Sequence, residues 1–282
     1  MHLYRWRIPE KENGSTVFNA VRRGLPLMPR EQILRAFARR DVRMDDVRCR
    51  RDDPARPGCA VSVYTDFFPQ IRVLYEDERV VVIHKPAGLC VEDEACGMTV
   101  LSLMSDMLSS PVWLCHRLDT RTEGVLLLAR DEEAYRLCAD AFAARQTEKR
   151  YECLVRGKMD PAEAVLNAYL VKDAQAGKVR VVTHQGPGAL KITTGYRVLE
   201  ESDGMSRLTV TLYTGRTHQI RAHMAFIGHP VVGDDLYGDR RLNRALGLPP
   251  LKLCSVELRL TFPPDGPLSY LNGVGFTTSA SF

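Results

Sequence analysis

The 282-residue sequence lacks the features of a membrane-spanning or secreted chain. No stretch approaches the roughly 18 consecutive apolar residues that a transmembrane helix requires. The opening stretch, MHLYRWRIPEKENG, lacks the apolar core of a signal peptide. We therefore expect a cytoplasmic protein.

The sequence also lacks the spacings of metal and redox sites. Its eight cysteines are scattered through apolar segments, with no C-x-x-C pair and no group of His and Cys at zinc-finger spacing. His218 and His223 do not have the spacing of a helical metalloprotease, and no acidic residue stands at ligand spacing from them. We expect reduced, mostly buried thiols and no bound metal ion.

Positive charge is concentrated in the first quarter of the chain. The formal net charge is only +4, but residues 1–70 carry 14 basic and 9 acidic side chains. Within this region PREQILRAFARRDVR (29–43) has helical spacing, with an apolar stripe of Ile33, Leu34 and Phe37. A basic face like this one is typical of nucleic-acid binding, although a solvated helix face would show the same pattern. The arginines that lie largely off the stripe are Arg30, Arg35, Arg39 and Arg40.

A turn and a strand follow the basic helix. Pro54, Pro57 and Gly58 mark the turn, and the alternation of apolar and polar residues over 61–65 predicts a strand. A basic helix, a turn and a valine-rich strand, over about residues 15–65, resemble an S4-like RNA-binding domain. Where that domain usually has an Asn-Gly turn, this chain has Asp45-Asp46.

The rest of the chain mixes strands and helices. Pro69 in DFFPQI (66–71) predicts a linker, so we expect two domains, 1–66 and 67–282. The predicted elements do not alternate strictly, which favours an α+β fold with a mixed, mainly antiparallel sheet and flanking helices. Helices are predicted over 99–109 and 131–146, and strands around the acidic turn 76–78 and over 125–129, 149–157, 191–199, 208–215 and 251–262.

The stretch HRLDTRTEGVLLLAR (116–130) places one carboxylate, Asp119, among several cations. The run VLLLA (125–129) predicts a buried strand, so Asp119 lies on the loop that leads into it, a common location for catalytic groups. Beside Arg117 and Arg121 this carboxylate would stay ionised and would suit a nucleophile or a base. A surface cluster of ion pairs is the alternative.

A second polar stretch is TGRTHQIRAHMAFIGHPVVGDDLYG (214–238). Its centre predicts a helix in which His218 and Arg221, three residues apart, share one face. Thr217, His218 and Gln219 at the helix start could cap the helix or contact a substrate.

Taken together with VIHKPAGLCV and KRYECLVRG, these stretches resemble the successive motifs of the RluA-type (ribosomal large subunit) pseudouridine synthases over about residues 72–264. The resemblance implies a catalytic domain around a curved, mostly antiparallel sheet. It also implies isomerisation of uridine to pseudouridine in structured RNA, either 23S rRNA or tRNA, without a cofactor and by a monomer.

The resemblance also implies roles for individual residues. Asp119 is the expected catalytic aspartate, Tyr151 the tyrosine that stacks on the base, and Arg221 the basic partner of Asp119. Arg117 would occupy the space left by the extruded uridine, and Leu253 would line the uracil pocket. Further expected contacts to RNA or substrate are His116, Thr122, His218 and Gln219 in the motifs, and Arg30, Arg35 and Arg39 in the basic helix.

Three positions depart from the family pattern. Arg121 stands where aspartate or lysine is common. Glu123 stands where serine is common, and it could hydrogen-bond within the loop, pair with Arg121 or disturb the pocket. Cys254 stands where histidine is common, so a hydrogen bond could be missing there. Two other functions stay open: a non-catalytic RNA-binding or ribosome-assembly protein that retains the fold, and a nucleoside hydrolase that uses Asp119 and Glu123 as a carboxylate pair.

Overall fold

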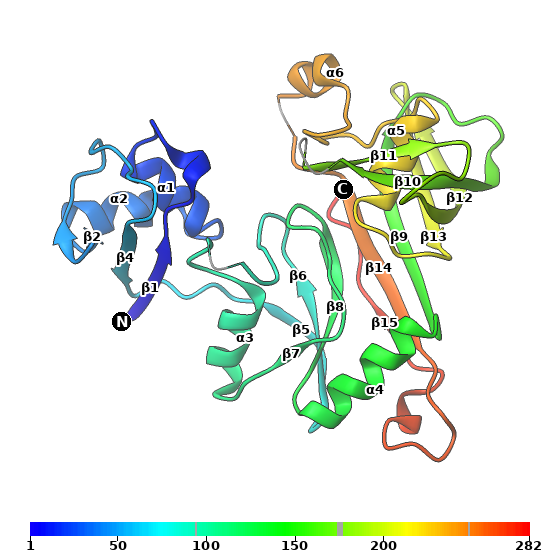
Figure 1. Cartoon of the computed structure of the whole chain (residues 1–282), viewed down its shortest axis with the longest axis horizontal. Helices are drawn as coiled ribbons and strands as arrows, with labels where there is room; N and C mark the ends of the chain where they lie inside the picture. The colour runs from blue at the N-terminus through cyan, green and yellow to red at the C-terminus, as the bar shows by residue number, and fades with distance from the viewer. Residues whose placement is uncertain (94, 174–176, 248) are drawn as a thin grey trace. The chain divides into compact units, whose positions relative to one another are not determined.

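The computed structural model describes residues 1–93, 95–173, 177–247 and 249–282. The chain forms two compact units, whose elements are labelled in Figure 1. The first unit comprises Met1–Ile71 and Gly88–Val112, and the second comprises Arg72–Ala87 and Trp113–Phe282. Over the described ranges, no helix has both the length and the apolar character needed to cross a membrane.

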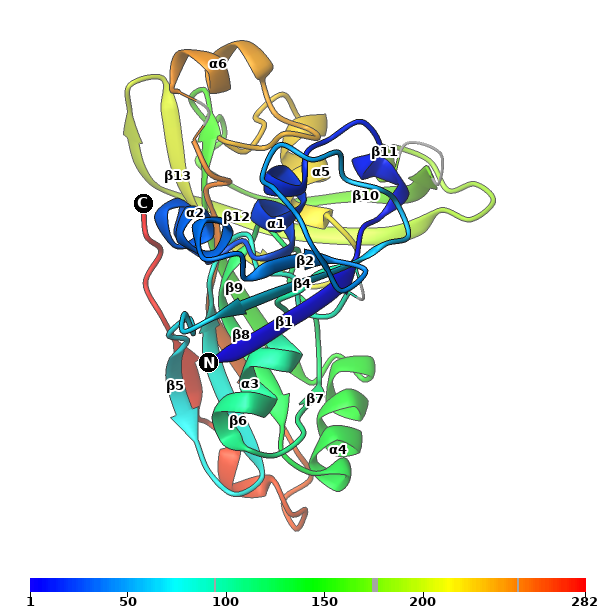
Figure 2. The same ribbon diagram turned by 90° about the vertical axis from the view of Figure 1, so that its left-hand side faces the viewer.

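The first unit is built on a four-stranded antiparallel sheet. Tyr4 and Trp6 alternate with exposed residues along its first strand and are both buried, as expected when one face of a sheet is covered. Helices α1 (Val17–Gly24) and α2 (Arg30–Ala38) lie beside this sheet (Figure 2). In sheet order the strands are β1 (His2–Arg7), β4 (Ala60–Thr65), β2 (Val42–Met44) and β3 (Val47–Arg48), and the unit also contains η1 (Glu10–Glu12) and α3 (Val100–Leu108).

The turn between β2 and β3 explains why Asp45-Asp46 can replace an Asn-Gly pair. Both residues have positive φ, 49° and 63°, which is the conformation that a tight hairpin turn requires at both central positions. Aspartate is among the few non-glycine residues that adopt this conformation readily. The Asp45 carboxylate also accepts a hydrogen bond of 2.8 Å from the Ala60 N–H, which fixes the turn against β4.

The helix predicted over 29–43 is shorter than expected. It ends at Ala38, Arg40 adopts a φ of 61°, and the Asp41 N–H donates to the Ala36 carbonyl at 2.9 Å, which closes the helix end. The next residues belong to the sheet because Val42 is fully buried in β2. The prediction for 39–43 was therefore wrong, since burial of Val42 in the sheet outweighed helical spacing.

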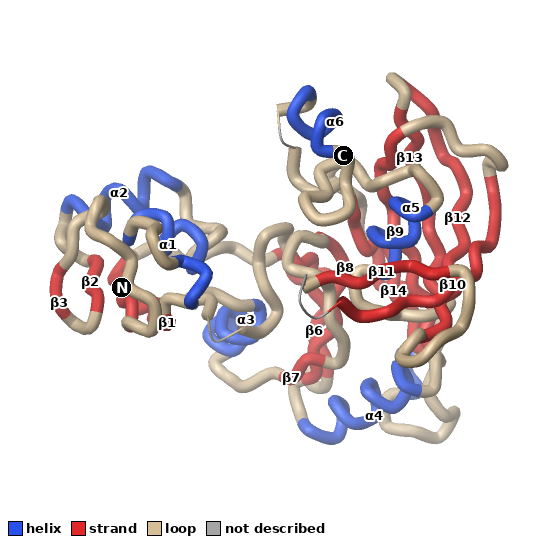
Figure 3. Tube along the Cα trace, turned by 45° about the horizontal axis from the view of Figure 1, so that its top comes forward, coloured by secondary structure: helices blue, strands red, loops and turns tan. Residues whose placement is uncertain are grey.

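The second unit contains an eleven-stranded sheet, drawn in red in Figure 3, in which β8 and β14 pair in parallel and the other pairs are antiparallel. The predicted α+β class with a mixed, mainly antiparallel sheet is confirmed. Its main path is β11 (Lys178–Val182), β10 (Glu163–Asp173), β12 (Leu190–Ser202), β13 (Met205–Leu212), β9 (Thr147–Arg156), β14 (Leu253–Leu260), β8 (Glu123–Ala129), β6 (Val80–Lys85) and β5 (Arg72–Glu76), with β15 (Gly275–Thr277) on β14 and β7 (Trp113–Leu114) on β8.

Helices flank this sheet. The helix predicted over 131–146 is α4 (Glu132–Ala143), whose N-cap Asp131 accepts a 2.8 Å hydrogen bond from the Ala134 N–H. The helix predicted after residue 217 is α5 (Gln219–Phe226), which packs on β11 and β12. The remaining helical segments of the unit are α6 (Arg240–Ala245) and η2 (Ser269–Leu271).

Strand β8 anchors the loop that carries Asp119. Every residue of β8 is buried, which confirms the buried strand predicted over 125–129. Val125, Leu127 and Ala129 lie in one hydrophobic cluster with residues of β6, β14 and α4. The loop that carries Asp119 therefore ends at a strand that is fixed in the core.

Gly124 gives a test of the contact between β8 and β14. Its φ is +114°, and a Cβ atom there would lie 2.1 Å from the Ser255 carbonyl oxygen. We expect Gly124→Ala to lower the free energy of unfolding by about 3 kcal/mol or more, because backbone strain and a backbone clash add together. Urea denaturation would measure this loss.

Gly188→Ala is the matched control for this substitution. Gly188 also has a positive φ, +70°, but a Cβ atom there would have no neighbour within 4 Å, so only the strain of about 1 kcal/mol should appear. Equal losses for the two variants would contradict a close approach of the two strands.

Candidate active site

Asp119 lies on a short loop that is tied to the sheet by its backbone. The Thr122 N–H donates to the Asp119 carbonyl at 3.0 Å and closes the turn. Lys85, at the end of β6, is fully buried, and its ammonium group donates to the carbonyls of Pro86 and Thr120 at 3.0 Å each. The Asp119 side chain is 25% exposed, so the carboxylate is held in place and still accessible.

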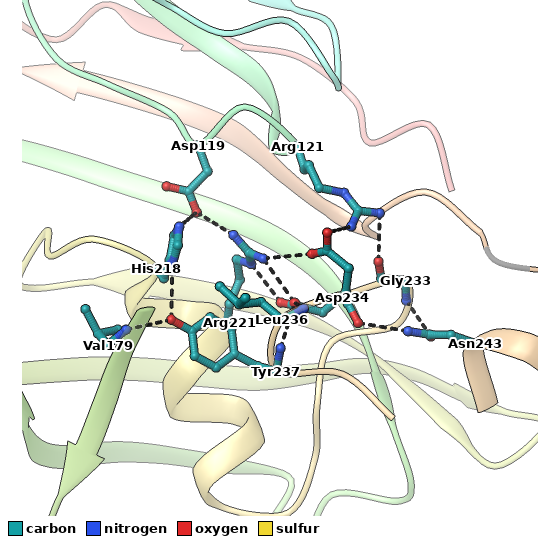
Figure 4. A network of polar contacts seen from close by, with 11 residues as sticks. Asp119, Arg121, Val179, His218, Arg221, Gly233, Asp234, Leu236, Tyr237 and Asn243 are labelled. Carbon is teal, nitrogen blue, oxygen red and sulfur yellow. Dashed lines mark hydrogen bonds and ion pairs between the residues drawn. The ribbon is translucent and has the colours of Figure 1, made fainter. Parts of the chain in front are cut away.

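Arg221 of α5 holds the Asp119 carboxylate. Its side chain is 5% exposed and grips Asp234 through two contacts, Nε to Oδ2 at 2.7 Å and Nη2 to Oδ1 at 3.0 Å (Figure 4). The remaining nitrogen, Nη1, lies 3.3 Å from Oδ2 of Asp119. Since a guanidinium group is rigid and planar, its two-point contact with Asp234 fixes the direction in which Nη1 points.

Asp234 is the buried counterpart of this arginine. It is fully buried, and its Oδ1 also accepts hydrogen bonds from the N–H groups of Leu236 at 2.8 Å and Tyr237 at 3.0 Å. Burial opposes ionisation, but the hydrogen bond and charge of Arg221 hold the pKa of Asp234 below its ordinary value. The Arg221 pKa is raised in turn against its own burial, so both partners are charged.

Arg121 is engaged elsewhere in the same network. Its Nη1 lies 2.7 Å from Asp235, and its Nη2 donates to the Gly233 carbonyl at 3.0 Å. Among the residues that the structure describes, the ion-pair partners of Asp119 are Arg221 and His218. Arg121 stands two residues after Asp119 in the sequence, but its side chain points toward residues 233–235 and pairs with Asp235.

His218 and Tyr237 reach Asp119 from another side. His218 Nε2 lies 3.8 Å from Asp119 Oδ2, and its Nδ1 lies 3.0 Å from the Tyr237 hydroxyl oxygen. That oxygen accepts a 2.9 Å hydrogen bond from the Val179 N–H. Burial lowers the pKa of His218, with the Asp119 charge opposing the shift, so the imidazole is neutral near pH 7.

The two oxygens of Asp119 have different surroundings. Both Arg221 and His218 face Oδ2, while Oδ1 has no hydrogen-bond partner among the described residues. With His218 neutral, the cluster of Asp119, Arg121, Arg221, Asp234 and Asp235 retains one net negative charge. An ionised carboxylate with one free oxygen can attack an electrophilic carbon, accept a proton or stabilise a nearby positive charge.

Tyr151 and Leu253 lie on neighbouring strands of the sheet. Tyr151 of β9 faces Ser255 of β14, and Leu253 faces Cys153, so the side chains of Tyr151, Cys153 and Leu253 share one face. Both Tyr151 and Leu253 are buried. Burial raises the pKa of Tyr151 to about 12, and the Asp119 charge adds to the shift, so this phenol is neutral.

His116 and Thr122 point into the fold. The His116 Nε2 accepts a hydrogen bond of 3.1 Å from the Leu127 N–H, and its ring stacks on Phe142 at a centroid distance of 4.6 Å. Thr122 is buried and contributes its N–H to the turn at Asp119. Substrate contacts by these two residues remain predictions.

The Gln219 side chain is fully used within the protein. Its oxygen accepts from the Thr214 hydroxyl and the Arg216 N–H, and its NH₂ group donates to the Thr193 carbonyl and the Thr194 hydroxyl, at 2.9–3.1 Å. These four bonds saturate the amide. Contact with a substrate through this group would require one of them to break.

The predicted arginines are exposed. Arg117 lies on the Asp119 loop, while Arg30 and Arg35 on α2 and Arg39 at its end belong to the first unit. All four can meet a polyanion without desolvation of a buried charge. Their contacts with RNA remain predictions.

Asp234, Asp235 and Tyr237 are site residues that the sequence did not predict. They belong to GDDLYG, the end of the second polar stretch, and they follow Arg221 by 13 to 16 positions. The sequence feature that could have indicated them is a pair of aspartates shortly after a helix that carries a buried arginine. Over the described ranges, no group of three His, Cys, Asp or Glu side chains could hold a metal ion.

The structure gives Glu123 a partner outside its own loop. Its Oε1 accepts hydrogen bonds from the Ser281 N–H at 3.1 Å and the Ser281 hydroxyl at 2.8 Å. Cys254, which pairs with Glu123 in the parallel contact of β14 and β8, is fully buried, and burial raises its pKa to about 12. Of the alternatives for Glu123, pairing with Arg121 does not occur, since Arg121 binds Asp235.

Comparisons with known proteins find similarity to RNA pseudouridine synthases. A family model described as RNA pseudouridylate synthase matches residues 79–226. Ribosomal large subunit pseudouridine synthase C of Escherichia coli strain K12 is 29% identical, over 92% of this chain and 89% of that protein. The protein of the same name from Vibrio parahaemolyticus is 28% identical, over 92% and 88%. An uncharacterized RNA pseudouridine synthase of Mycobacterium bovis is 35% identical, over 69% and 66%.

Two solved human structures are also similar. RNA pseudouridylate synthase domain containing 4 aligns with a TM-score of 0.61 and 28% identity, over 74% of this chain and 88% of that chain. RNA pseudouridylate synthase domain containing 1 aligns with a TM-score of 0.62 and 23% identity, over 77% and 93%, which shows a shared fold alone.

His116 makes stability depend on pH. Burial lowers its pKa to about 3 from an ordinary 6.5, so the unfolded chain binds the proton more tightly than the folded chain. The stabilisation is complete above pH 6.5 and is lost as the pH falls from there toward the folded pKa. We expect the free energy of unfolding to fall over this range with a slope of up to about 1.4 kcal/mol per pH unit from this residue.

Urea denaturation of the His116→Gln variant between about pH 7 and about pH 4.5 would test this. Glutamine can place an acceptor near the Leu127 N–H but does not titrate, so the slope should decrease. His223, whose pKa burial lowers to about 4, should keep part of the slope. The exposed His184→Gln variant is the control, and an unchanged slope in His116→Gln would contradict the assignment.

Proposed function

Because this chain belongs to the RNA pseudouridylate synthase family, we propose that Asp119, Tyr151 and Arg221 form its catalytic centre. The chain is an RNA pseudouridine synthase, an isomerase that acts on RNA. One observation carries the proposal for the site. Arg221, locked by the buried Asp234, holds one oxygen of Asp119 at 3.3 Å and leaves the other oxygen free.

The reaction defines what this site must do. The bond between N1 of uracil and C1′ of ribose breaks, the base turns over, and a bond from C5 to C1′ forms. C5 loses a proton and N1 gains one, so atoms and electrons balance without a cofactor. Since a stacked uridine hides these atoms, the nucleotide must leave the stack, which costs a few kcal/mol.

Asp119 supplies a negative charge for the cleavage and re-formation of the bond between base and ribose. Its free Oδ1 can bond to a carbon of the nucleoside or stabilise the positive charge that develops at C1′ when N1 departs. Arg221 keeps the carboxylate ionised in a partly buried position, where an unpaired charge would be strongly disfavoured. The exposed Arg117, on the same loop, is available to fill the space that the base leaves.

Tyr151 and Leu253 provide the walls of the base pocket in this proposal. An aromatic ring is a usual platform for an unstacked RNA base. Tyr151 suits this task because it is neutral and fixed between β13 and β14. Leu253, on the same face, excludes water while the detached base turns.

We propose large-subunit ribosomal RNA as the substrate, with the first unit as an accessory RNA-binding domain of S4-like type. The names of the bacterial relatives support the choice of rRNA, and tRNA is the alternative. In this proposal residues 1–66, which form most of the first unit, bind RNA and residues 67–282 catalyse, in a cytoplasmic monomer. A groove of about 700 Å³ beside α2 supports the RNA-binding role, because four arginines line it: Arg40, Arg48, Arg50 and Arg51.

The other functions left open by the sequence have less support. A non-catalytic RNA-binding protein would have no need for the buried pair of Arg221 and Asp234 behind Asp119. A nucleoside hydrolase would release free uracil from RNA, whereas an isomerase retains the base. Identification of the reaction products therefore separates the three functions.

Asp119→Asn tests the catalytic assignment. The variant keeps the shape of the side chain but loses its charge, so we expect turnover to fall by about 1,000-fold or more while RNA binding persists. Release of tritium from RNA labelled at C5 of uridine measures turnover, and chromatography of the products detects any free uracil. The exposed Asp203→Asn variant is the control. Full activity of Asp119→Asn, or uracil as the product, would contradict the proposal.

Reversal of two charges on α2 and its end tests the RNA-binding face. We expect Arg35→Glu with Arg39→Glu to weaken RNA binding and to lower the slope of log affinity against log salt by about one to two, because phosphate contacts are lost. Turnover of a small saturating substrate should be spared. Reversal of Arg136 and Lys158, exposed cations of the second unit, is the matched control. An unchanged slope in the α2 variant would remove this face from the interface.

A further inference from the structure

A chain of three polar contacts connects the backbone of β11 to Asp119. The Val179 N–H meets the Tyr237 hydroxyl at 2.9 Å, that hydroxyl meets His218 Nδ1 at 3.0 Å, and His218 Nε2 faces Asp119 Oδ2 at 3.8 Å (Figure 4). None of these three contacts involves Arg221. The aspartate is therefore approached by two different side chains, Arg221 and His218.

The direction of each hydrogen bond follows from the donors available. A backbone N–H can only donate, so the Tyr237 oxygen is the acceptor toward Val179. Within the described residues, the other hydrogen-bond partner of this hydroxyl is His218 Nδ1. The arrangement that leaves no hydroxyl proton without an acceptor there is the one in which the phenolic O–H donates to that nitrogen. A neutral imidazole carries one proton, which must then be on Nε2, the nitrogen that faces Asp119.

The backbone of His218 supports a role directed at the aspartate. It is the N-cap residue of α5, yet its side chain makes no capping hydrogen bond. Its φ of 53° and ψ of 21° lie in the left-handed region, which is uncommon for residues other than glycine, although histidine is among those found there more often. In this conformation the ring faces the Tyr237 hydroxyl and Asp119.

We propose that His218 is a positioning residue for Asp119 and that Tyr237 selects the tautomer in which His218 donates to it. The proposal rests on the assignment of Asp119 as the catalytic aspartate. Arg221 and His218 then hold the same oxygen, Oδ2, and turn Oδ1 toward the nucleoside. The 3.8 Å contact shortens to a hydrogen bond when RNA fills the site, as catalytic contacts commonly do on substrate binding.

The short segment 234–237 orients both groups that face Asp119, Arg221 and His218. Asp234 Oδ1 accepts the Tyr237 N–H at 3.0 Å while the same carboxylate grips Arg221, and the Arg221 guanidinium lies 5.5 Å from the centre of the Tyr237 ring. Residues 234–237 thus orient the cationic donor directly and the neutral donor through Tyr237. A second, neutral donor holds Asp119 without adding to the charge of the site.

A pair of substitutions at residue 218 tests whether the Nε2 proton matters. Glutamine can place an N–H near the position of Nε2, and methionine has a similar length without a donor, so both share the cost of the left-handed backbone. We expect kcat to fall by about 3-fold in His218→Gln and by about 30-fold in His218→Met, with KM for RNA within about 2-fold of the parent in both. Equal kcat values in the two variants would overturn the proposal.

A double-mutant cycle tests the role of Tyr237. In the parent chain Tyr237→Phe should lower kcat by about 10-fold, because His218 loses the hydroxyl that selects its tautomer. In the His218→Gln background the same change should lower kcat by less than about 2-fold, since glutamine has no tautomer to select. A merely structural role, such as pairing the Val179 N–H, would give the same loss in both backgrounds and would overturn the proposal.

Two controls complete the experiment. Tyr196→Phe removes a different tyrosine hydroxyl, which donates to the Pro161 carbonyl at 2.8 Å, and should leave kcat unchanged. Asp119→Asn, measured in parallel, separates failure of the catalytic centre from failure of the positioning role. If Asp119→Asn is active, the proposed catalytic centre is wrong. If Asp119→Asn is inactive but the double-mutant cycle is additive, only the proposed role of His218 and Tyr237 is wrong.

Discussion

A buried guanidinium held between two aspartates is the contact on which the proposed active site depends. Arg221 and Asp234 are both withdrawn from solvent, so neither could keep its charge without the other. Removing one partner of such a pair generally costs about 3–5 kcal/mol, because it leaves an uncompensated buried charge. The pair fixes the direction of the Arg221 Nη1–H bond. That bond in turn fixes the position of Asp119 Oδ2.

The sheet of the second unit supplies the rigidity around this contact. Asp119 precedes a strand that is buried along its whole length, Tyr151 and Leu253 lie on two adjacent strands, and Arg221 comes from a helix packed on β11 and β12. The residues proposed for the reaction are thus carried by separate segments of this unit.

The two units differ in how their charged side chains are placed. The cluster around Asp119 carries one net negative charge, and its central pair, Arg221 and Asp234, is buried, where charges interact strongly in a medium of low polarity. The first unit instead carries exposed arginines, whose interaction with phosphates is long-ranged and sensitive to salt. Affinity for RNA and chemistry at one uridine would then be properties of different parts of the chain.

The sequence by itself determined the class of fold, most helices and strands, the buried strand after Asp119 and the motifs of the family, because these depend on spacing within short segments. It did not determine where α2 ends, since the burial of Val42 in a sheet overrides helical spacing. Nor did it reveal that Arg121 binds Asp235, or that Asp234 and Tyr237 support Arg221 and His218. Arg121 and Asp235 lie more than about a hundred positions apart, and Asp234 and Tyr237 follow the end of α5, so only the folded chain brings these partners within hydrogen-bonding distance.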